Sequence, residues 1–161
     1  MSAIEMKTTP ASAKRLNALR ANSLAATVML VLEFGLGVGV NLYAKIPTAD
    51  DGKSLLPAFG RAVSGGPIVL TLHALLGTLL LITGVAAVVR ASLLRSSELV
   101  ALASVALVAL VVAWQSGARF VGNEANAASM AMAIATGVTI LCYAVILFVV
   151  APSATAERTP Q

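Results

Sequence analysis

An acidic side chain, Glu33, and the only histidine, His73, lie inside long apolar stretches of this 161-residue chain. Glu33 stands ten residues before the end of its stretch at Tyr43, which corresponds to about 15 Å along a helix at 1.5 Å per residue. An acidic residue near the centre of a bilayer costs about 2.5–3.5 kcal/mol on insertion scales, so it faces the interior of a helical bundle. We therefore expect Glu33 to be either a hydrogen-bonded structural carboxyl or part of a proton or ion path.

His73 stands seven residues beyond Gly66, about 10 Å deep by the same rise. One helical turn further along, Gly37 follows Glu33 and Gly77 follows His73, and small residues allow two helices in lipid to approach closely. The spacing predicts that Glu33 and His73 meet on the inner side of the bundle. Because their expected depths differ by about 5 Å, a water or Asn126 could stand between them. The alternative is that His73 only packs.

Further polar residues fall at the outer ends of the apolar stretches. Asn41, Gln115 and Asn126 complete the candidate proton or polar site with Glu33 and His73, although capping of helix ends is the favoured explanation of their positions. Ser129 is a further polar residue in this region, and Trp114 is predicted to anchor the interface between lipid and water.

Several kinds of chemistry have no support in the sequence. We find no H-E-x-x-H, no G-x-S-x-G and no phosphate-binding glycine loop, and the single Cys142 excludes an internal disulfide. The basic residues do not alternate with aromatics, which make up 4% of the chain, so nucleic acid is not an expected partner. A non-enzymatic role is favoured.

The composition predicts where these residues are held. Charged residues make up 11% of the chain, against about 25% in soluble domains, so most of the surface must face lipid. Four apolar stretches are long enough to cross about 30 Å of hydrocarbon. We predict an all-α, four-helix transmembrane bundle over residues 23–150 of a multi-pass protein in the cell membrane. Its helices are expected at 23–43, 66–89, 99–115 and 127–150.

The remaining segments are polar. Residues 1–22 and 151–161 are predicted to be cytoplasmic tails, and residues 44–65 form the longest loop. Within this loop, Leu55, Leu56, Phe59 and Val63 recur at helical spacing, which predicts a short helix on the membrane surface.

The distribution of Lys and Arg predicts the orientation. Seven of these residues fall on the side of the two tails and of the second turn, and four fall on the other side, so the richer side is expected to be cytoplasmic. A topology reporter fused after Gln161 should therefore be cytoplasmic, and one inserted near Gly52 should be external. An external signal from the C-terminal fusion would contradict both the orientation and the helix count.

Some segments carry a resemblance to known groups of proteins. They are Glu33-Phe34-Gly35, Asn41-Leu42-Tyr43, His73-Ala74-Leu75-Leu76-Gly77, Ser116-Gly117-Ala118-Arg119-Phe120 and Ser129-Met130-Ala131-Met132-Ala133. Together they resemble small bacterial four-helix membrane proteins, which implies the architecture but no activity. The His-x-x-x-Gly segment is distantly similar to the haem-binding bundles of the cytochrome b561 and haem A synthase kind. That likeness implies haem held by histidines on paired helices, yet this chain has His73 alone. The central acid Glu33 is also similar to that of the small multidrug transporters.

Three hypotheses follow. The first is an accessory or binding protein whose partners are the lipid bilayer and a second copy or another subunit of a membrane complex. The second is a membrane redox protein in which His73 helps to hold haem or a quinone. The third is a small proton-coupled transporter that uses Glu33.

Overall fold

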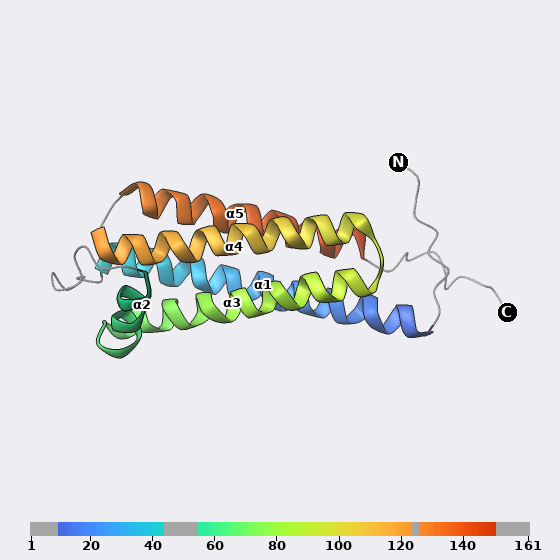
Figure 1. Ribbon diagram of the computed structural model, residues 1–161, viewed down its shortest axis with the longest axis horizontal. Coiled ribbons are helices and arrows are strands. Elements are labelled where there is room, and N and C mark those ends of the chain that lie inside the picture. The colour runs from blue at the N-terminus through green and yellow to red at the C-terminus, as the bar shows by residue number, and fades with distance from the viewer. Residues whose placement is uncertain (1–9, 44–54, 124–125, 151–161) are drawn as a thin grey trace.

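The computed structural model describes residues 10–43, 55–123 and 126–150. They form five helices, of which four are long and antiparallel to their neighbours and one, α2, lies across one end of the bundle (Figure 1). The helices are α1 (Pro10–Tyr43), α2 (Leu55–Ser64), α3 (Ile68–Leu93), α4 (Ser97–Asn123) and α5 (Asn126–Val149).

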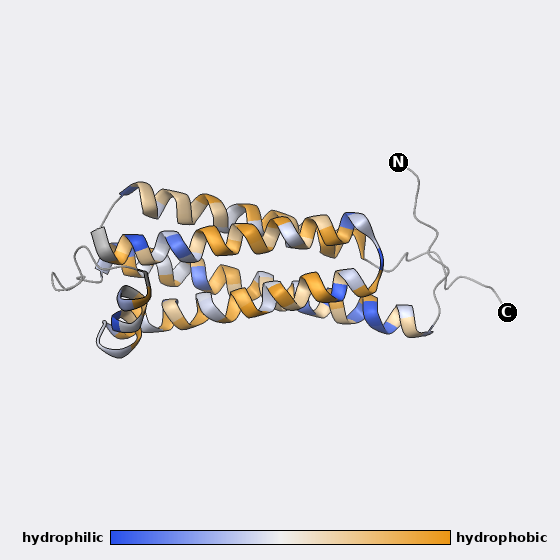
Figure 2. Cartoon of the chain, in the orientation of Figure 1, coloured by the Kyte–Doolittle hydropathy of each residue, from blue (hydrophilic) through white to orange (hydrophobic). Residues whose placement is uncertain are grey.

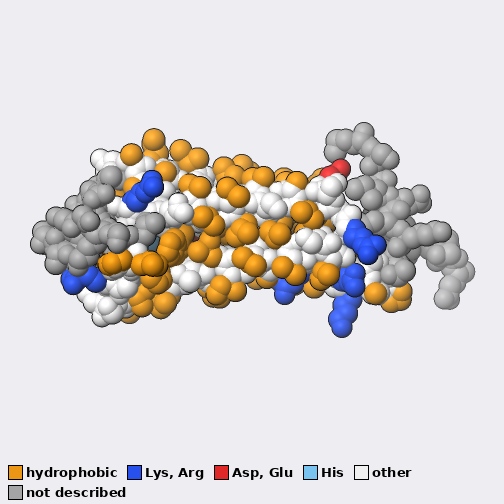
Figure 3. All heavy atoms as spheres, viewed as in Figure 1, with side chains coloured by type: hydrophobic (Ala, Val, Ile, Leu, Met, Phe, Trp, Pro, Cys, Tyr) orange, Lys and Arg blue, Asp and Glu red, His pale blue; other side chains and the backbone are white. Residues whose placement is uncertain are grey.

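The four long helices are each long and apolar enough to cross a membrane. Their outward faces carry large apolar side chains, such as Leu141 at 67% exposure and Phe148 at 84%. Hydrophobic residues run along the length of the bundle (Figure 2). In the space-filling view, hydrophobic side chains cover its middle and Lys and Arg side chains lie toward its two ends (Figure 3). This distribution suits a molecule whose solvent is lipid in the middle and water at the ends. The protein is a multi-pass membrane protein with the predicted four-helix bundle.

The long helices stand at the corners of a square. Helix α1 packs on α3 and α5, α4 packs on the same two helices, and α2 packs on α3 and α4. Leu30, Leu80, Tyr143 and Ile146 belong to the buried cluster at the centre, and each is at most 1% exposed. Pro10 and Val150, the first and last described residues, lie at the same end of the bundle (Figure 1).

The α3–α4 connection is the tightest turn of the bundle. The N–H of Leu94 donates to the carbonyl of Ala91 at 3.0 Å, and Arg95 has a φ of 55°. So short a connection keeps α3 and α4 adjacent and antiparallel. Glu98 then lies in the first turn of α4, where a negative charge interacts favourably with the helix dipole.

Helices α1 and α4 extend furthest beyond their predicted bounds. Helix α1 begins at Pro10 rather than at Ser23, so the predicted tail is helical from Pro10 onward. Its alanines and leucines favour a helix, and Leu19 is fully buried in the core. Helix α4 continues past its predicted end at Gln115 to Asn123.

Helix α2 confirms the short helix predicted in the long loop. Residues 1–9 and 151–161 of the predicted tails, and residues 44–54 of that loop, lie outside the described residues.

Candidate functional site

The central feature of the bundle is a direct contact between Glu33 of α1 and His73 of α3. Nδ1 of His73 lies 3.0 Å from Oε1 of Glu33, and the two side chains are 14% and 11% exposed. The predicted approach is present, and neither a water nor Asn126 is needed between them. The expected depth difference of about 5 Å is wrong because it assumes that the end of α1 and the start of α3 lie at the same level. His73 is five residues from the start of α3, and Glu33 is ten residues from the end of α1. Since the two side chains meet, the end of α1 projects about 7 Å beyond the start of α3.

Two glycines make this contact possible. A Cβ on Gly77 of α3 would lie 2.9 Å from Oε1 of Glu33, and a Cβ on Gly37 of α1 would lie 3.2 Å from Cε1 of His73. Each ionisable side chain therefore rests against a glycine of the opposite helix. Since any larger residue would meet the partner, the pair of glycines fixes how closely α1 and α3 approach.

The carboxyl of Glu33 and the imidazole of His73 use only part of their hydrogen-bonding capacity within the described residues. Oε2 of Glu33 is buried and has no hydrogen-bond partner among the described residues. Nδ1 of His73 is within hydrogen-bond distance of Oε1, yet the two groups are not aligned as a hydrogen bond. A buried polar atom without a partner costs about 1–3 kcal/mol, so a hydrogen-bond donor placed at Oε2 would stabilise the site.

A cavity of about 80 Å³ lies next to the pair and is lined by residues from all five helices. Leu30, Leu80 and Leu110 line it toward the centre of the bundle, and Phe59 and Trp114 line it toward α2. This space is enough for a few water molecules or a small polar group. The acid and the histidine therefore share a mostly apolar chamber.

Trp114 belongs to this chamber and not to the lipid interface. Its Nε1 donates to Oγ1 of Thr78 at 3.4 Å, and its ring stacks at a tilt on Phe59 of α2, with centroids 5.5 Å apart and planes at 44°. The prediction that Trp114 is an interface anchor is therefore wrong. Its indole N–H found a partner inside the bundle, as buried tryptophans usually do.

A groove connects Glu33 and His73 with the outside of the bundle. A groove of about 150 Å³ between α1 and α5 is lined by Glu33, Gly37, Asn41 and His73, which also line the first cavity. Helix α5 contributes the opposite wall, including Ser129 and Thr136. The site can therefore be approached sideways, between α1 and α5.

The structure separates the predicted polar residues into two groups. Asn41 lines both cavities with Glu33 and His73, whereas Gln115 and Asn126 are exposed and line neither. The residues that sequence reasoning missed are aromatic or lie on α5. They are Phe59, Trp114, Met132 and Thr136. The α5 residues share one face with Ser129, at spacings of three and seven, and this periodicity is the signal that could have found them.

A haem does not fit the residues of this site. His73 is the only histidine of the chain, and its contact with a carboxylate through Nδ1 is typical of a metal-bound imidazole. However, the bundles that hold haem do so with histidines on paired helices, and this chain has no second histidine to complete such a pair. Among the described residues, no group of three or more His, Cys, Asp or Glu could hold a metal ion.

The comparisons with protein-family models, with curated proteins and with solved structures gave no match to this chain, so its own geometry must carry the functional argument.

Proposed function

We propose that this protein binds a small ligand dissolved in the membrane, one with an apolar body and a hydrogen-bonding head of the quinone type, at Glu33 and His73. One observation carries the proposal. The buried Oε2 of Glu33 has no partner among the described residues, and Glu33 and His73 both line a cavity that continues into a groove between α1 and α5. A binding pocket combines a mostly apolar lining with a few convergent polar groups, and this site has that composition.

The chemistry of the pair suits a quinone ring. The imidazole of His73 can donate a hydrogen bond to a carbonyl oxygen, and Oε2 of Glu33 can accept one from the hydroxyl of a reduced quinone. Phe59 and Trp114 offer flat apolar surfaces beside the pair. Aromatic rings pack favourably in offset or edge-to-face arrangements, so a planar head group would be stabilised on both its polar edge and its faces.

The groove between α1 and α5 supplies the route for such a ligand. Its walls include Val38 and Leu42, which are exposed on the outer face of α1. A molecule whose tail stays in the hydrocarbon could therefore bring its head to Glu33 without leaving the membrane. We place the site in the outer half of the bilayer, on the orientation that the Lys and Arg distribution favours.

Binding is a better explanation of the site than transport across the membrane. Leu30 and Leu80, each 1% exposed, separate the cavity from the opposite end of the bundle. Proton-coupled transport by Glu33 would require these side chains to move apart. It remains the second candidate because a carboxyl and an imidazole 3.0 Å apart can share a proton.

Fluorescence of Trp114 tests the proposal directly. Trp114 is the only tryptophan of the chain and lines the cavity, so a bound quinone should quench its emission in a saturable way. Glu33→Gln removes the carboxylate acceptor, and His73→Phe removes the donor. Because a hydrogen bond to a charged group contributes about 1.5–3 kcal/mol, each change should weaken the Kd about tenfold or more.

Gln115→Ala is the matched control, since Gln115 is exposed on the same helix as Trp114 and lines neither cavity. This variant should bind as the unchanged protein does. Quenching that does not saturate, or that is equal in all four proteins, would mean that the quinone meets Trp114 only by partitioning into the detergent or lipid. The binding proposal would then be wrong.

A further inference from the structure

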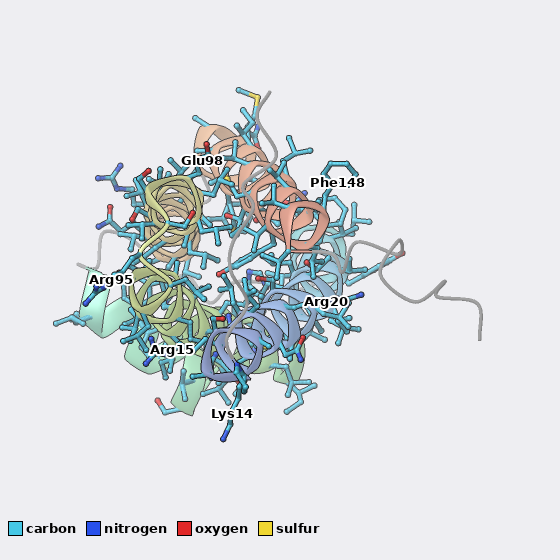
Figure 4. All side chains as sticks on the ribbon, turned by 90° about the vertical axis from the view of Figure 1, so that its right-hand side faces the viewer. Lys14, Arg15, Arg20, Arg95, Glu98 and Phe148 are labelled. Carbon is cyan, nitrogen blue, oxygen red and sulfur yellow. The ribbon has the colours of Figure 1, made fainter. Side chains whose placement is uncertain are left out.

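The end of the bundle opposite α2 carries a concentration of positive charge. Five basic residues lie on α1, on α3 or in the turn after α3, and Figure 4, which looks onto this end, labels four of them. They are Lys14, Arg15, Arg20, Arg90 and Arg95. Glu98 is the only acidic residue at this end among the residues that the structure describes. A negatively charged partner is therefore favoured here.

Arg90 is held in place at the seam between α1 and α3. Its Nη1 donates to Oδ1 of Asn22, and Nδ2 of Asn22 donates in turn to the carbonyl of Thr83 at 3.3 Å. Asn22 is only 9% exposed, so its amide has a fixed orientation. The guanidinium has no other partner among the described residues, and its remaining N–H groups are available to an anion.

Arg15 lies further along the same seam. It is seven residues before Asn22, which places the two on one face of α1, and its Nη1 donates to the carbonyl of Leu93 at 3.0 Å. The side chain is otherwise exposed. Both arginines are thus tied to the α1–α3 seam by hydrogen bonds and are not free surface charges.

Apolar surface begins directly beside these arginines. Val89 precedes Arg90 in α3 and is 54% exposed, and Leu93, whose carbonyl accepts from Arg15, is 52% exposed. Lipid-facing and charged surface therefore adjoin each other over the last turn of α3. A phospholipid at this boundary would present its phosphate to the guanidinium groups and its acyl chains to the apolar surface next to them.

We propose that the α1–α3 seam at this end binds the phosphate of an anionic phospholipid. A guanidinium forms two parallel hydrogen bonds to phosphate oxygens, which a lysine ammonium does not. Asn22 keeps the Arg90 fork at a fixed place, and Arg15, Arg20 and Arg95 add positive charge that favours a lipid with a net negative headgroup over a zwitterionic one. The adjacent apolar surface favours a lipid over a free phosphate ion. This site is separate from the cavity at Glu33 and His73 and does not depend on the function proposed for it.

Native mass spectrometry of the purified full chain tests the site. The protein is titrated with phosphatidylglycerol and, separately, with phosphatidylcholine of the same acyl composition. We expect tighter binding of phosphatidylglycerol, and at least a tenfold loss of that binding in Arg90→Gln. Arg119→Gln is the matched control, because Arg119 is an exposed arginine near the opposite end of α4, and it should leave the affinity unchanged.

A second variant distinguishes loss of the lipid site from loss of the fold. Arg90→Gln leaves buried Asn22 with an altered partner. Arg15 is exposed and, among the described residues, bonds only to a helix-end carbonyl, so Arg15→Gln should keep the fold and still weaken lipid binding several-fold. Equal losses in the Arg15, Arg90 and Arg119 variants would overturn the proposal, as would equal affinity for the two lipids. Displacement of the lipid by inorganic phosphate at the same concentration would show that the site takes a free anion instead.

Discussion

Replacing Glu33 with alanine should lower the free energy of unfolding of the bundle by about 2 kcal/mol. The change leaves the buried imidazole of His73 without the carboxylate that lies 3.0 Å away, and it adds space to an existing cavity. Glu33→Gln keeps an oxygen acceptor and nearly the same shape, so its effect should stay below about 1 kcal/mol. Reversible unfolding in mixed micelles measures both differences.

Gln115→Ala provides the reference for this experiment, because the Gln115 side chain is exposed and lines neither cavity. It should change the stability by less than about 0.5 kcal/mol. If Glu33→Ala were as stable as the reference variant, the contact with His73 would contribute nothing to the fold. A Glu33→Gln variant as unstable as Glu33→Ala would show instead that the negative charge itself is required.

A methyl group at Gly77 is expected to have the second large effect. Its Cβ would stand 2.9 Å from Oε1 of Glu33, so the carboxylate must shift and its contact with His73 is disturbed. We expect Gly77→Ala to weaken quinone binding about tenfold, as loss of the carboxylate in Glu33→Gln does, and to cost about 1–3 kcal/mol of stability through overpacking. Trp114 quenching and unfolding in mixed micelles measure the two quantities.

Gly35→Ala is the control for the glycine experiment. A Cβ at Gly35 would have no atom within 4 Å, so this substitution should leave binding unchanged. Because alanine favours a helix more than glycine does, Gly35→Ala should even stabilise α1 by up to about 1 kcal/mol. Similar losses in both glycine variants would mean that the close approach at Gly77 has no special importance.

The sequence was sufficient to predict the four spans and the contact between Glu33 and His73. Both follow from large free-energy costs of placing polar groups in lipid. The backbone must form long apolar helices to cross the membrane, and two polar side chains in lipid are most stable when they contact each other. The glycines at 37 and 77 could be assigned to the same contact because they lie one turn from the two polar residues. These features depend on spacing along one helix, which the sequence shows directly.

The features that were missed depend on packing between helices. The first turns of α1 are stabilised because Leu19 is buried in the core. No local sequence pattern shows which residues of other helices will cover Leu19. Trp114 faces the interior because its indole N–H donates to Thr78 and its ring packs on Phe59. The depth of His73 relative to Glu33 depends on how far α1 projects beyond α3, which is a property of the assembled pair.

The square arrangement of the helices has a consequence for biogenesis. Helix α1 leaves the ribosome first and α5 last, and the two are neighbours in the finished bundle. The contact between Glu33 and His73 can form once α3 has been inserted, and the tight turn after α3 brings α4 in beside it. The α1–α5 seam therefore closes only after synthesis of the last span. The wall that completes the groove beside Glu33 is consequently the final part of the site to be assembled, so a nascent chain that stops before Asn126 would carry the acid–histidine pair without it.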